Sequence, residues 1–346
     1  MKEVIACLGA GRMGCGIAIA FAYAGHPVRL IDFKPRAADV FTTLQAEVRT
    51  ELVSTLQSLV TFGLMQPDDI GIVAERVSVL PDVEAAAGLH GAAVIFEGIP
   101  EIVALKREAF ARASALADPQ AIIASTTSTI LVDDLSGAVL HPERFLNAHW
   151  LNPAYLIPLV ELSPGAATDP AVTARLRSLL EGIGKVPIVC AATPGYIVPR
   201  LQVVAMNEAA RMVEEGVATA EDIDRAVRYG FGLRYAVLGL LEFIDWGGGD
   251  ILYYASRYLT EALGSDRYTA PDIIQHNMDQ GRLGMRSGQG FLDYQSIDVE
   301  AFRQDRLRAF VAQLRHAGLV RPPVTDADTA PAPERPSAPG HHPPTP

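Results

Sequence analysis

The feature that most restricts the fold of this chain is a glycine-rich loop between two apolar segments near its N-terminus. Residues 4–8 are apolar and predict a buried strand, and the loop Gly9-Ala10-Gly11-Arg12-Met13-Gly14 follows directly. Apolar residues at helical spacing then continue to Gly25, and a second apolar strand over residues 28–31 ends at Asp32. This order of strand, tight turn, helix and strand predicts a βαβ unit, whose parallel sheet needs helices on its faces.

Each glycine of this loop has its own physical role. Gly9 permits the tight turn, Gly11 allows a pyrophosphate to approach the backbone, and Gly14 allows the helix to pack on the strand. The N-terminus of the helix then directs free N–H groups and the positive end of its dipole toward the phosphates. The expected contacts with a dinucleotide cofactor include Arg12 and Met13 between the glycines.

Asp32 follows the second strand, where a carboxylate accepts hydrogen bonds from both hydroxyls of a ribose. A 2′-phosphate would be repelled there, so the acid favours NAD. Lys34 and Arg36 are close in sequence, and NADP therefore stays open as an alternative.

The α/β pattern continues after a helical excursion. Residues 36–76 predict a helical hairpin, which is equally consistent with a lid or packing element and with a substrate contact. Glu97 ends one of the next strands, at the edge where open parallel sheets bind their ligands. The hydroxyl cluster Ser125-Thr126-Thr127-Ser128-Thr129 ends another strand, where it caps a helix or holds a substrate oxygen.

His149 and Glu161 lie in two consecutive apolar strands, residues 145–151 and 157–162, joined by a turn through Asn152-Pro153. Adjacent strands bring such side chains within hydrogen-bond reach. A carboxylate that accepts from one imidazole nitrogen selects the tautomer and raises the basicity of the other nitrogen, which makes a general base. The alternative is a core histidine satisfied by a nearby acid.

The pattern changes to helices alone after a break at Thr193-Pro194-Gly195. We therefore predict an NAD-binding Rossmann domain over residues 1–192 and an all-α domain over residues 193–319. Residues 320–346 hold nine of the 24 prolines and predict a disordered tail, in which His341-His342 is too weak a signal for a metal site. The fold class is a doubly wound α/β sheet followed by an all-α domain.

Composition limits the partners and the compartment. The net charge of −11 argues against nucleic acid and anionic membrane surfaces as partners. Three cysteines give no disulfide framework and favour a reducing compartment. The sequence shows no signal peptide and no apolar run long enough to span a membrane, which predicts a soluble, cytoplasmic protein.

These stretches together closely resemble the L-3-hydroxyacyl-CoA dehydrogenase family, including its branch with gulonate 3-dehydrogenase (λ-crystallin) and carnitine dehydrogenase. The family patterns Ser-Asn-Thr-Ser, His-Phe-Phe-Asn-Pro and Pro-Gly-Phe-Ile-Val-Asn-Arg appear here as Ser125-Thr126-Thr127-Ser128, His149-Trp150-Leu151-Asn152-Pro153 and Pro194-Gly195-Tyr196-Ile197-Val198-Pro199-Arg200. Glu221-Asp222-Ile223-Asp224 and Arg286-Ser287-Gly288-Gln289-Gly290-Phe291 also match family stretches.

The resemblance implies a set of roles. His149 takes the hydroxyl proton while the substrate carbon passes a hydride to the nicotinamide, and Glu161 orients His149. Ser128 and Asn152 contact the substrate. The cofactor is also contacted by three charged residues at family positions, Glu97, Glu101 and Lys106. The resemblance and the apolar load of the α domain both imply a homodimer through that domain.

Three departures from the family pattern bear on the substrate. Pro199 replaces the substrate-side asparagine, which removes a donor to the substrate carbonyl and suggests that a helix begins at this proline. Residues 37–75 hold one basic residue, Arg49, against six acids, where acyl-CoA members carry a lysine cluster suited to the phosphates of CoA. Arg234-Tyr235-Ala236 resembles the free-acid branch, in which an arginine binds a carboxylate in two hydrogen bonds. The alternative for Arg234 is a salt bridge to Glu242 or Asp245.

We therefore predict an NAD-dependent dehydrogenase acting on a 3-hydroxy or 3-oxo carboxylic substrate. One alternative is a true 3-hydroxyacyl-CoA dehydrogenase. A second is the same fold acting on an aromatic or polyketide-like substrate, with Trp150 and Tyr155 lining the pocket. A third is a non-catalytic NAD-binding protein.

Overall fold

The computed structural model of the chain describes residues 2–323, which fall into two compact units that divide after Glu208, inside helix α8 (Val198–Glu214). Each unit is described below by itself. The tail expected from residue 320, with His341-His342, lies outside the described residues apart from its first four positions. The boundary expected near residue 192 stays a prediction, and the division by compactness falls later in the chain.

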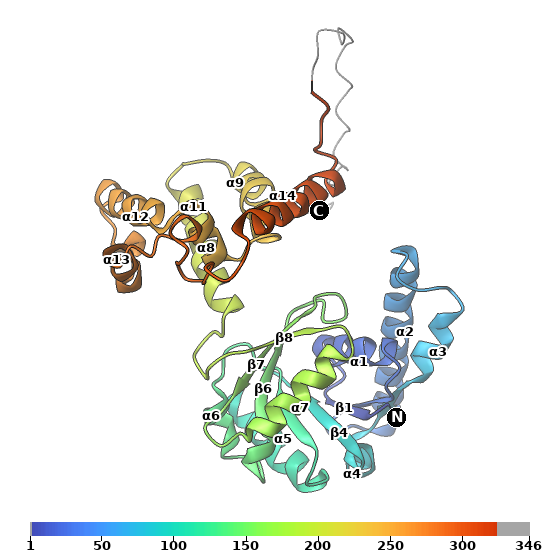
Figure 1. The fold of residues 1–346 in the computed structure, drawn as a ribbon. Coiled ribbons are helices and arrows are strands. Elements are labelled where there is room, and N and C mark those ends of the chain that lie inside the picture. The colour runs from blue at the N-terminus through green and yellow to red at the C-terminus, as the bar shows by residue number, and fades with distance from the viewer. Residues whose placement is uncertain (1, 324–346) are drawn as a thin grey trace. The chain divides into compact units, whose positions relative to one another are not determined.

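The first unit is built on a single sheet (Figure 1). Among the described residues its eight strands lie in the order β3-β2-β1-β4-β5-β6-β7-β8, and only the β6–β7 pair is antiparallel. The strands are β1 Val4–Leu8, β2 Val28–Ile31, β3 Val77–Leu80, β4 Ala92–Glu97, β5 Ile122–Ser125, β6 Phe145–Trp150, β7 Leu159–Pro164 and β8 Val186–Val189. The helices are α1 Arg12–Tyr23, α2 Ala38–Thr61, α3 Asp69–Glu75, α4 Ala85–Leu89, α5 Val103–Leu116, α6 Val132–Ser136 and α7 Pro170–Glu181.

Both faces of this sheet are buried, because successive side chains of a strand point to opposite faces. In β1, Ile5 and Cys7 enter one hydrophobic cluster, with α1, α2 and α7, whereas Ala6 and Leu8 enter a second cluster, with α4, α5 and α6. The doubly wound α/β class predicted from the sequence is confirmed.

Trp150 differs from one expectation. It is 1% exposed and packs against Phe21 and Phe96, with the Lys185 ammonium over its ring. It therefore belongs to the core between the sheet and α1 and does not line an open substrate pocket. Its place in a strand buried on both faces is the reason, because either side of such a strand meets a packed layer.

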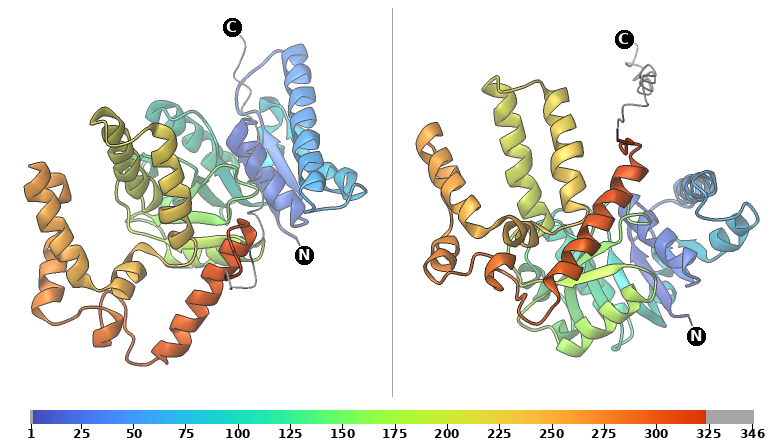
Figure 2. Two further views of the ribbon diagram at one scale, coloured as in Figure 1. Left: turned by 90° about the horizontal axis from the view of Figure 1, so that it is seen from above. Right: turned by 45° about the horizontal axis from the view of Figure 1, so that its top comes forward.

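The helical excursion forms the hairpin α2–α3, in which the two helices lie side by side (Figures 1 and 2). One stripe of α2, formed by Val48, Leu52, Leu56 and Leu59, is buried in the first cluster. Arg49 donates to the Ala74 carbonyl at 3.2 Å, which uses the hairpin's basic residue for internal packing.

The second unit is built from helices, and among its described residues isolated β-bridges join Gln289 to Gly284 and to Asp293 (Figure 1). After α8 it holds α9 Ala220–Ala226, a π-helical turn over Val227–Gly232, α10 Leu233–Tyr235, α11 Leu240–Gly247, α12 Gly249–Leu263, α13 Asp272–Asp279 and α14 Val299–His316. Helices α12 and α13 lie side by side in Figures 1 and 2. Within residues 2–323 no helix is both long and apolar enough to cross a bilayer.

A buried carboxylate organises this unit. Asp245 of α11 is 2% exposed and accepts hydrogen bonds from the amides of Phe291 and Leu292, at 2.9 and 2.8 Å, and from the Tyr294 hydroxyl at 3.2 Å. A Cβ on Gly290 would lie 2.0 Å from its Oδ1. The glycine is needed for this close approach, which explains part of the family-like stretch around it.

Candidate active site

His149 and Glu161 form the centre of the candidate site. The antiparallel register of β6 and β7 pairs the two residues directly, and Nδ1 of His149 lies 2.8 Å from Oε2 of Glu161. Both side chains are buried. Because a carboxylate only accepts hydrogen bonds, Nδ1 carries a hydrogen, and in the neutral imidazole the lone pair therefore lies on Nε2. The hydrogen-bond reach predicted from the strands is present.

The other oxygen of Glu161 lies at the N-terminus of α8. Its Oε1 accepts from the amides of Ile197 and Val198 at 2.9 and 2.8 Å. Burial raises the pKa of Glu161, but the bonds from His149 and from these two amides outweigh burial, so the pKa lies below its usual range. Glu161 is therefore ionised at neutral pH. Its negative charge interacts both with the imidazole and with the positive N-terminal end of α8.

Pro199 lies in the first turn of α8, which begins at Val198, one residue before the start suggested by the sequence. An amide at this position has no intrahelical acceptor, so proline is tolerated there. The next residue, Arg200, donates to the Gly195 carbonyl at 3.0 Å. The helix entry that holds Glu161 is thus compatible with the departure from the family asparagine.

Ser128 lies in a loop that follows β5, the strand next to β6. Its side chain is exposed, and its hydroxyl has no hydrogen-bond partner among residues 2–323. Its amide donates to Oε1 of Glu101 at 3.1 Å, and the same oxygen accepts from the hydroxyls of Thr127 and Thr129. The carboxylate of Glu101 therefore holds the loop and leaves the Ser128 hydroxyl available to a ligand.

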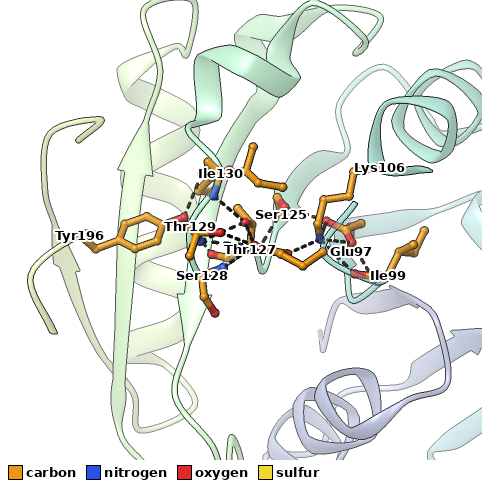
Figure 3. A network of polar contacts seen from close by, with 11 residues as sticks. Glu97, Ile99, Lys106, Ser125, Thr127, Ser128, Thr129, Ile130 and Tyr196 are labelled. Atoms are coloured by element: carbon orange, nitrogen blue, oxygen red, sulfur yellow. Dashed lines mark hydrogen bonds and ion pairs between the residues drawn. The ribbon is translucent and has the colours of Figure 1, made fainter. Parts of the chain in front are cut away.

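Glu97 and Lys106 form a buried ion pair behind this loop (Figure 3). Lys106 Nζ lies 2.7 and 2.9 Å from the two oxygens of Glu97, which also accept from the Ile99 amide and the Ser125 hydroxyl. Lys106 reaches Oε2 of Glu101 as well, at 3.2 Å. Glu97 and Lys106 are almost fully covered, so of the three predicted cofactor contacts only Glu101 has an exposed carboxylate.

The pKa of Glu101 reflects this arrangement. Burial raises it, but the hydrogen bond from Thr127 and the ammonium of Lys106 outweigh burial, so the pKa lies below its usual range. The loop is thus held by an ionised carboxylate.

The three glycines of the loop meet different surroundings. Gly9 has φ +96°, and a Cβ there would lie 2.9 Å from the Gly98 carbonyl oxygen. A Cβ on Gly14 would lie 2.1 Å from the Gly9 oxygen, whereas one on Gly11 would meet no atom within 4 Å. Gly11 precedes α1 and no side chain caps it. The first and third glycines are required by packing and the second faces open space, which fits a bound dinucleotide.

Asp32 lies at one side of a cleft of about 520 Å³, which is lined by residues from the segments 32–45 and 79–84. Its side chain is 8% exposed, and Oδ2 accepts from Arg36 Nε at 2.5 Å. Lys34 lines the same cleft. The carboxylate predicted to hold the ribose is thus in place, but it has a cationic neighbour that the sequence signalled only by proximity.

The remaining predicted substrate residues are Asn152 and Arg234. Asn152 is exposed and precedes Pro153 through a cis peptide bond. Arg234, in the second unit, is exposed, lies over the Phe243 ring at 5.3 Å and makes no ion pair within residues 2–323. The alternative partners behave differently, since Glu242 pairs with Arg306 and Asp245 is occupied by amides.

Tyr196 is a site residue that the sequence reasoning treated only as part of a motif. Its ring lies parallel to the His149 imidazole, with centroids 5.0 Å apart. The available signal was a tyrosine where the family pattern has phenylalanine.

Two family models account for most of the chain. The one described as "3-hydroxyacyl-CoA dehydrogenase, NAD binding domain" matches residues 4–193, and the one described as "3-hydroxyacyl-CoA dehydrogenase, C-terminal domain" matches residues 195–294. The chain belongs to the 3-hydroxyacyl-CoA dehydrogenase family. It is an NAD-dependent dehydrogenase that acts on a hydroxyl group, which confirms the predicted family, enzyme class and cofactor.

Similar members of the 3-hydroxyacyl-CoA dehydrogenase family carry different substrate names. The chain is 30% identical over 319 residues to 5-formyl-3-hydroxy-2-methylpyridine 4-carboxylate 5-dehydrogenase of Mesorhizobium japonicum, covering 91% of this chain and 98% of that protein. It is 33% identical to rabbit (Oryctolagus cuniculus) lambda-crystallin over 72% of this chain and 76% of that one. The solved 3-hydroxyacyl-CoA dehydrogenase of Archaeoglobus fulgidus has a TM-score of 0.73 at 29% identity, covering 92% and 100% of the two chains.

The lowered pKa of Glu161 predicts how stability depends on pH. A carboxyl whose folded pKa lies below its unfolded value, about 4.3 for glutamate, contributes stability that is present above that value. This contribution is lost as the pH falls through the folded pKa. In Glu161→Gln the loss of unfolding free energy between pH 6 and pH 4 should be smaller than in the wild type, measured by urea unfolding with tryptophan fluorescence.

Glu181→Gln is the matched control, because Glu181 is an exposed carboxylate paired with Arg177. It should follow the wild-type pH dependence. An acid sensitivity of Glu161→Gln equal to that of the wild type contradicts the lowered pKa.

Proposed function

We propose that this dehydrogenase acts on a 3-hydroxy or 3-oxo carboxylic substrate with a free carboxylate, and that His149 is its general base. The observation that carries the catalytic part is the buried His149–Glu161 pair at 2.8 Å. It supplies an imidazole whose Nε2 makes no hydrogen bond among residues 2–323, next to a carboxylate that is kept ionised by its bonds from His149 and from the start of α8. A histidine that only filled the core would not need this arrangement.

In the direction of oxidation, Nε2 of His149 takes the proton from the substrate hydroxyl. Glu161 stabilises the imidazolium that forms, because its charge lies 2.8 Å from Nδ1. The free hydroxyl of Ser128 donates to the substrate oxygen and orients it. Bound NAD supplies the acceptor for the hydride.

We assign the cofactor to the glycine loop and its surroundings. Amides at the start of α1, from Gly11 through Arg12 and Met13 to Gly14, bind the pyrophosphate, with Gly9 forming the turn. Asp32 accepts from the adenosine ribose in the cleft that it lines. Glu101 contacts the cofactor directly. Lys106 holds Glu101 through an ion pair, and its partner Glu97 accepts from the Ser125 hydroxyl.

Three observations support a free carboxylate in the substrate. The α2–α3 hairpin has no cationic cluster for the phosphates of CoA, since Arg49 bonds to a carbonyl. Arg234 is an exposed guanidinium without an ion pair among the described residues, and an unpaired fork suits a carboxylate. The relative from Mesorhizobium japonicum is named for a carboxylate. The second candidate is an acyl-CoA thioester, which the structure from Archaeoglobus fulgidus favours.

We also propose that the protein is a homodimer through its α-helical unit. Leu241 of α11 and Ile251, Tyr254 and Tyr258 of α12 are at least half exposed, and Ile251 and Tyr258 reach 61% and 70%. An apolar surface of this kind is typical of an interface with a second copy. The three cysteines are free thiols, which supports a reducing compartment such as the cytoplasm.

The general base is tested by His149→Gln, which keeps a polar side chain but cannot take the proton. We expect kcat to fall about 10²–10⁴-fold, the usual weight of a general base, in an assay that follows NADH absorbance. Leu156→Ala, a change in a 42% exposed side chain on the turn after the same strand, reports the effect of local disturbance. A kcat close to wild type in His149→Gln contradicts the mechanism.

The substrate class is tested with Arg234 and a panel of 3-hydroxy acids and their CoA thioesters. We expect turnover of free acids and a higher KM in Arg234→Lys. In Arg234→Ala we expect kcat/KM to fall by an amount equivalent to about 2–5 kcal/mol, the weight of a charge pair that is buried once the substrate is bound. Arg257→Ala is the control, because Arg257 also lies over an aromatic ring in this unit. Turnover of CoA thioesters alone, or an intact kcat/KM in Arg234→Ala, favours the acyl-CoA function instead.

The dimer is tested by the mass in solution. Light scattering at micromolar concentration should give twice the chain mass of 37.1 kDa, and Ile251→Glu should shift it toward the monomer. Val83→Glu places the same charge on a residue that is 90% exposed in the first unit, and it should leave the mass unchanged. A monomeric wild type contradicts the assembly.

A further inference from the structure

Tyr196 lies flat against the proposed general base. Its ring is parallel to the His149 imidazole within 2°, at a centroid distance of 5.0 Å, and the residue is 5% exposed. It follows Gly195, and the two residues have φ angles of +79° and +45°. A positive φ is uncommon for a bulky residue and is retained where the surroundings determine it. The backbone conformation therefore places this ring against His149.

The hydroxyl of Tyr196 connects two other elements of the site (Figure 3). It donates to the Thr127 carbonyl at 2.9 Å and accepts from Nδ2 of Asn147 at 2.9 Å. Thr127 directly precedes Ser128, and Asn147 lies in β6 with His149. One side chain therefore contacts the general base, the strand that carries it and the loop that presents Ser128.

We propose that Tyr196 is a positioning residue that couples His149 to Ser128, with its ring orienting the imidazole and its hydroxyl holding the carbonyl of the Ser128 loop. This inference rests on the proposed function, since it assumes that both residues act on the substrate oxygen.

The ring has a clear effect on the imidazole. The bond to Glu161 holds Nδ1 but still allows the imidazole to tilt about that contact. A parallel aromatic ring restricts the tilt, and its π face also favours the imidazolium formed during the reaction. The lone pair of Nε2 is thereby kept on one line toward the substrate.

The hydroxyl acts on the other half of the site. Burial raises the pKa of Tyr196, so the phenol stays protonated and remains a donor to Thr127. Glu101 holds the same loop from its other side, through Thr127 Oγ1 and the Ser128 amide. The loop is thus held at both ends of the Thr127-Ser128 peptide, which limits where the Ser128 hydroxyl can lie.

Packing alone does not require this hydroxyl. The family pattern has phenylalanine at this position, and a phenyl ring would cover His149 equally well. Tyr196→Phe therefore keeps the ring and the fold while it removes the two hydrogen bonds, and this makes it a selective test of the coupling.

The experiment is a double-mutant cycle with Tyr196→Phe and Ser128→Ala, on the substrate found by the panel. Losing a hydrogen bond that positions the loop should lower kcat about 3- to 10-fold, with KM changed less than about twofold. In the Ser128→Ala background the same substitution should cost less than about twofold, because no hydroxyl is left to position. Tyr23→Phe is the matched control, since the exposed Tyr23 also donates to a backbone carbonyl, and it should leave kcat and KM unchanged.

An equal loss of kcat in both backgrounds would mean that the hydroxyl only supports the fold, and it overturns the coupling. A wild-type kcat in Tyr196→Phe, or no effect of Ser128→Ala, overturns it as well. These results are distinct from failure of the proposed function, which is signalled by an active His149→Gln. An inactive His149→Gln with a neutral Tyr196→Phe removes this inference alone.

Discussion

The candidate site depends on one buried carboxylate. Glu161 is 0% exposed, and a charge that is removed from water must find partners inside the protein. It takes one hydrogen bond from His149 on the neighbouring strand and two from amides that open α8. The sheet, the imidazole and the first turn of a long helix are therefore linked through a single side chain. The hydrogen on Nδ1 of His149 and the two amides at the start of α8 all serve to satisfy this charge.

A second buried carboxylate organises the other half of the sheet edge. Glu97 ends β4 and pairs with Lys106 of α5, while it also accepts from Ser125 at the end of β5. Lys106 extends the network to Glu101, which holds the loop of Ser128. The two networks are joined by the hydroxyl of Tyr196, which reaches the Thr127 carbonyl. The loop therefore lies between the networks of Glu161 and Glu97. Both carboxylates find their partners only in the folded protein.

The cofactor end of the sheet is simpler, because packing decides most of it. Gly9 and Gly14 are required by close backbone contacts, whereas Gly11 faces open space. The charge at Asp32 is a different matter, since Arg36 already donates to it. In the proposed site, a ribose would share this carboxylate with the guanidinium of Arg36. The assignment of NAD as the cofactor rests on the family and not on this ion pair.

Much of this protein is determined by local sequence patterns. The alternation of apolar segments, the glycine loop and Asp32 predict the βαβ unit, because helix and strand periodicities and tight turns are local properties. His149 and Glu161 were predicted as a pair for the same reason, since consecutive strands joined by a short turn place their residues side by side. The register of β6 and β7 bears this out.

Tertiary structure decided which polar groups are used up by the protein and which stay available. Glu97 and Lys106 read as cofactor contacts but are covered, and Trp150 read as a pocket residue but packs against Phe21. In the sequence Tyr196 is only one residue of a motif, and its role depends on contacts with His149, Asn147 and Thr127 that the fold creates. These contacts join residues far apart in the chain, up to 69 positions for Tyr196 and Thr127. Burial and pairing over such separations depend on the packing of whole elements, and a local pattern carries no information about them.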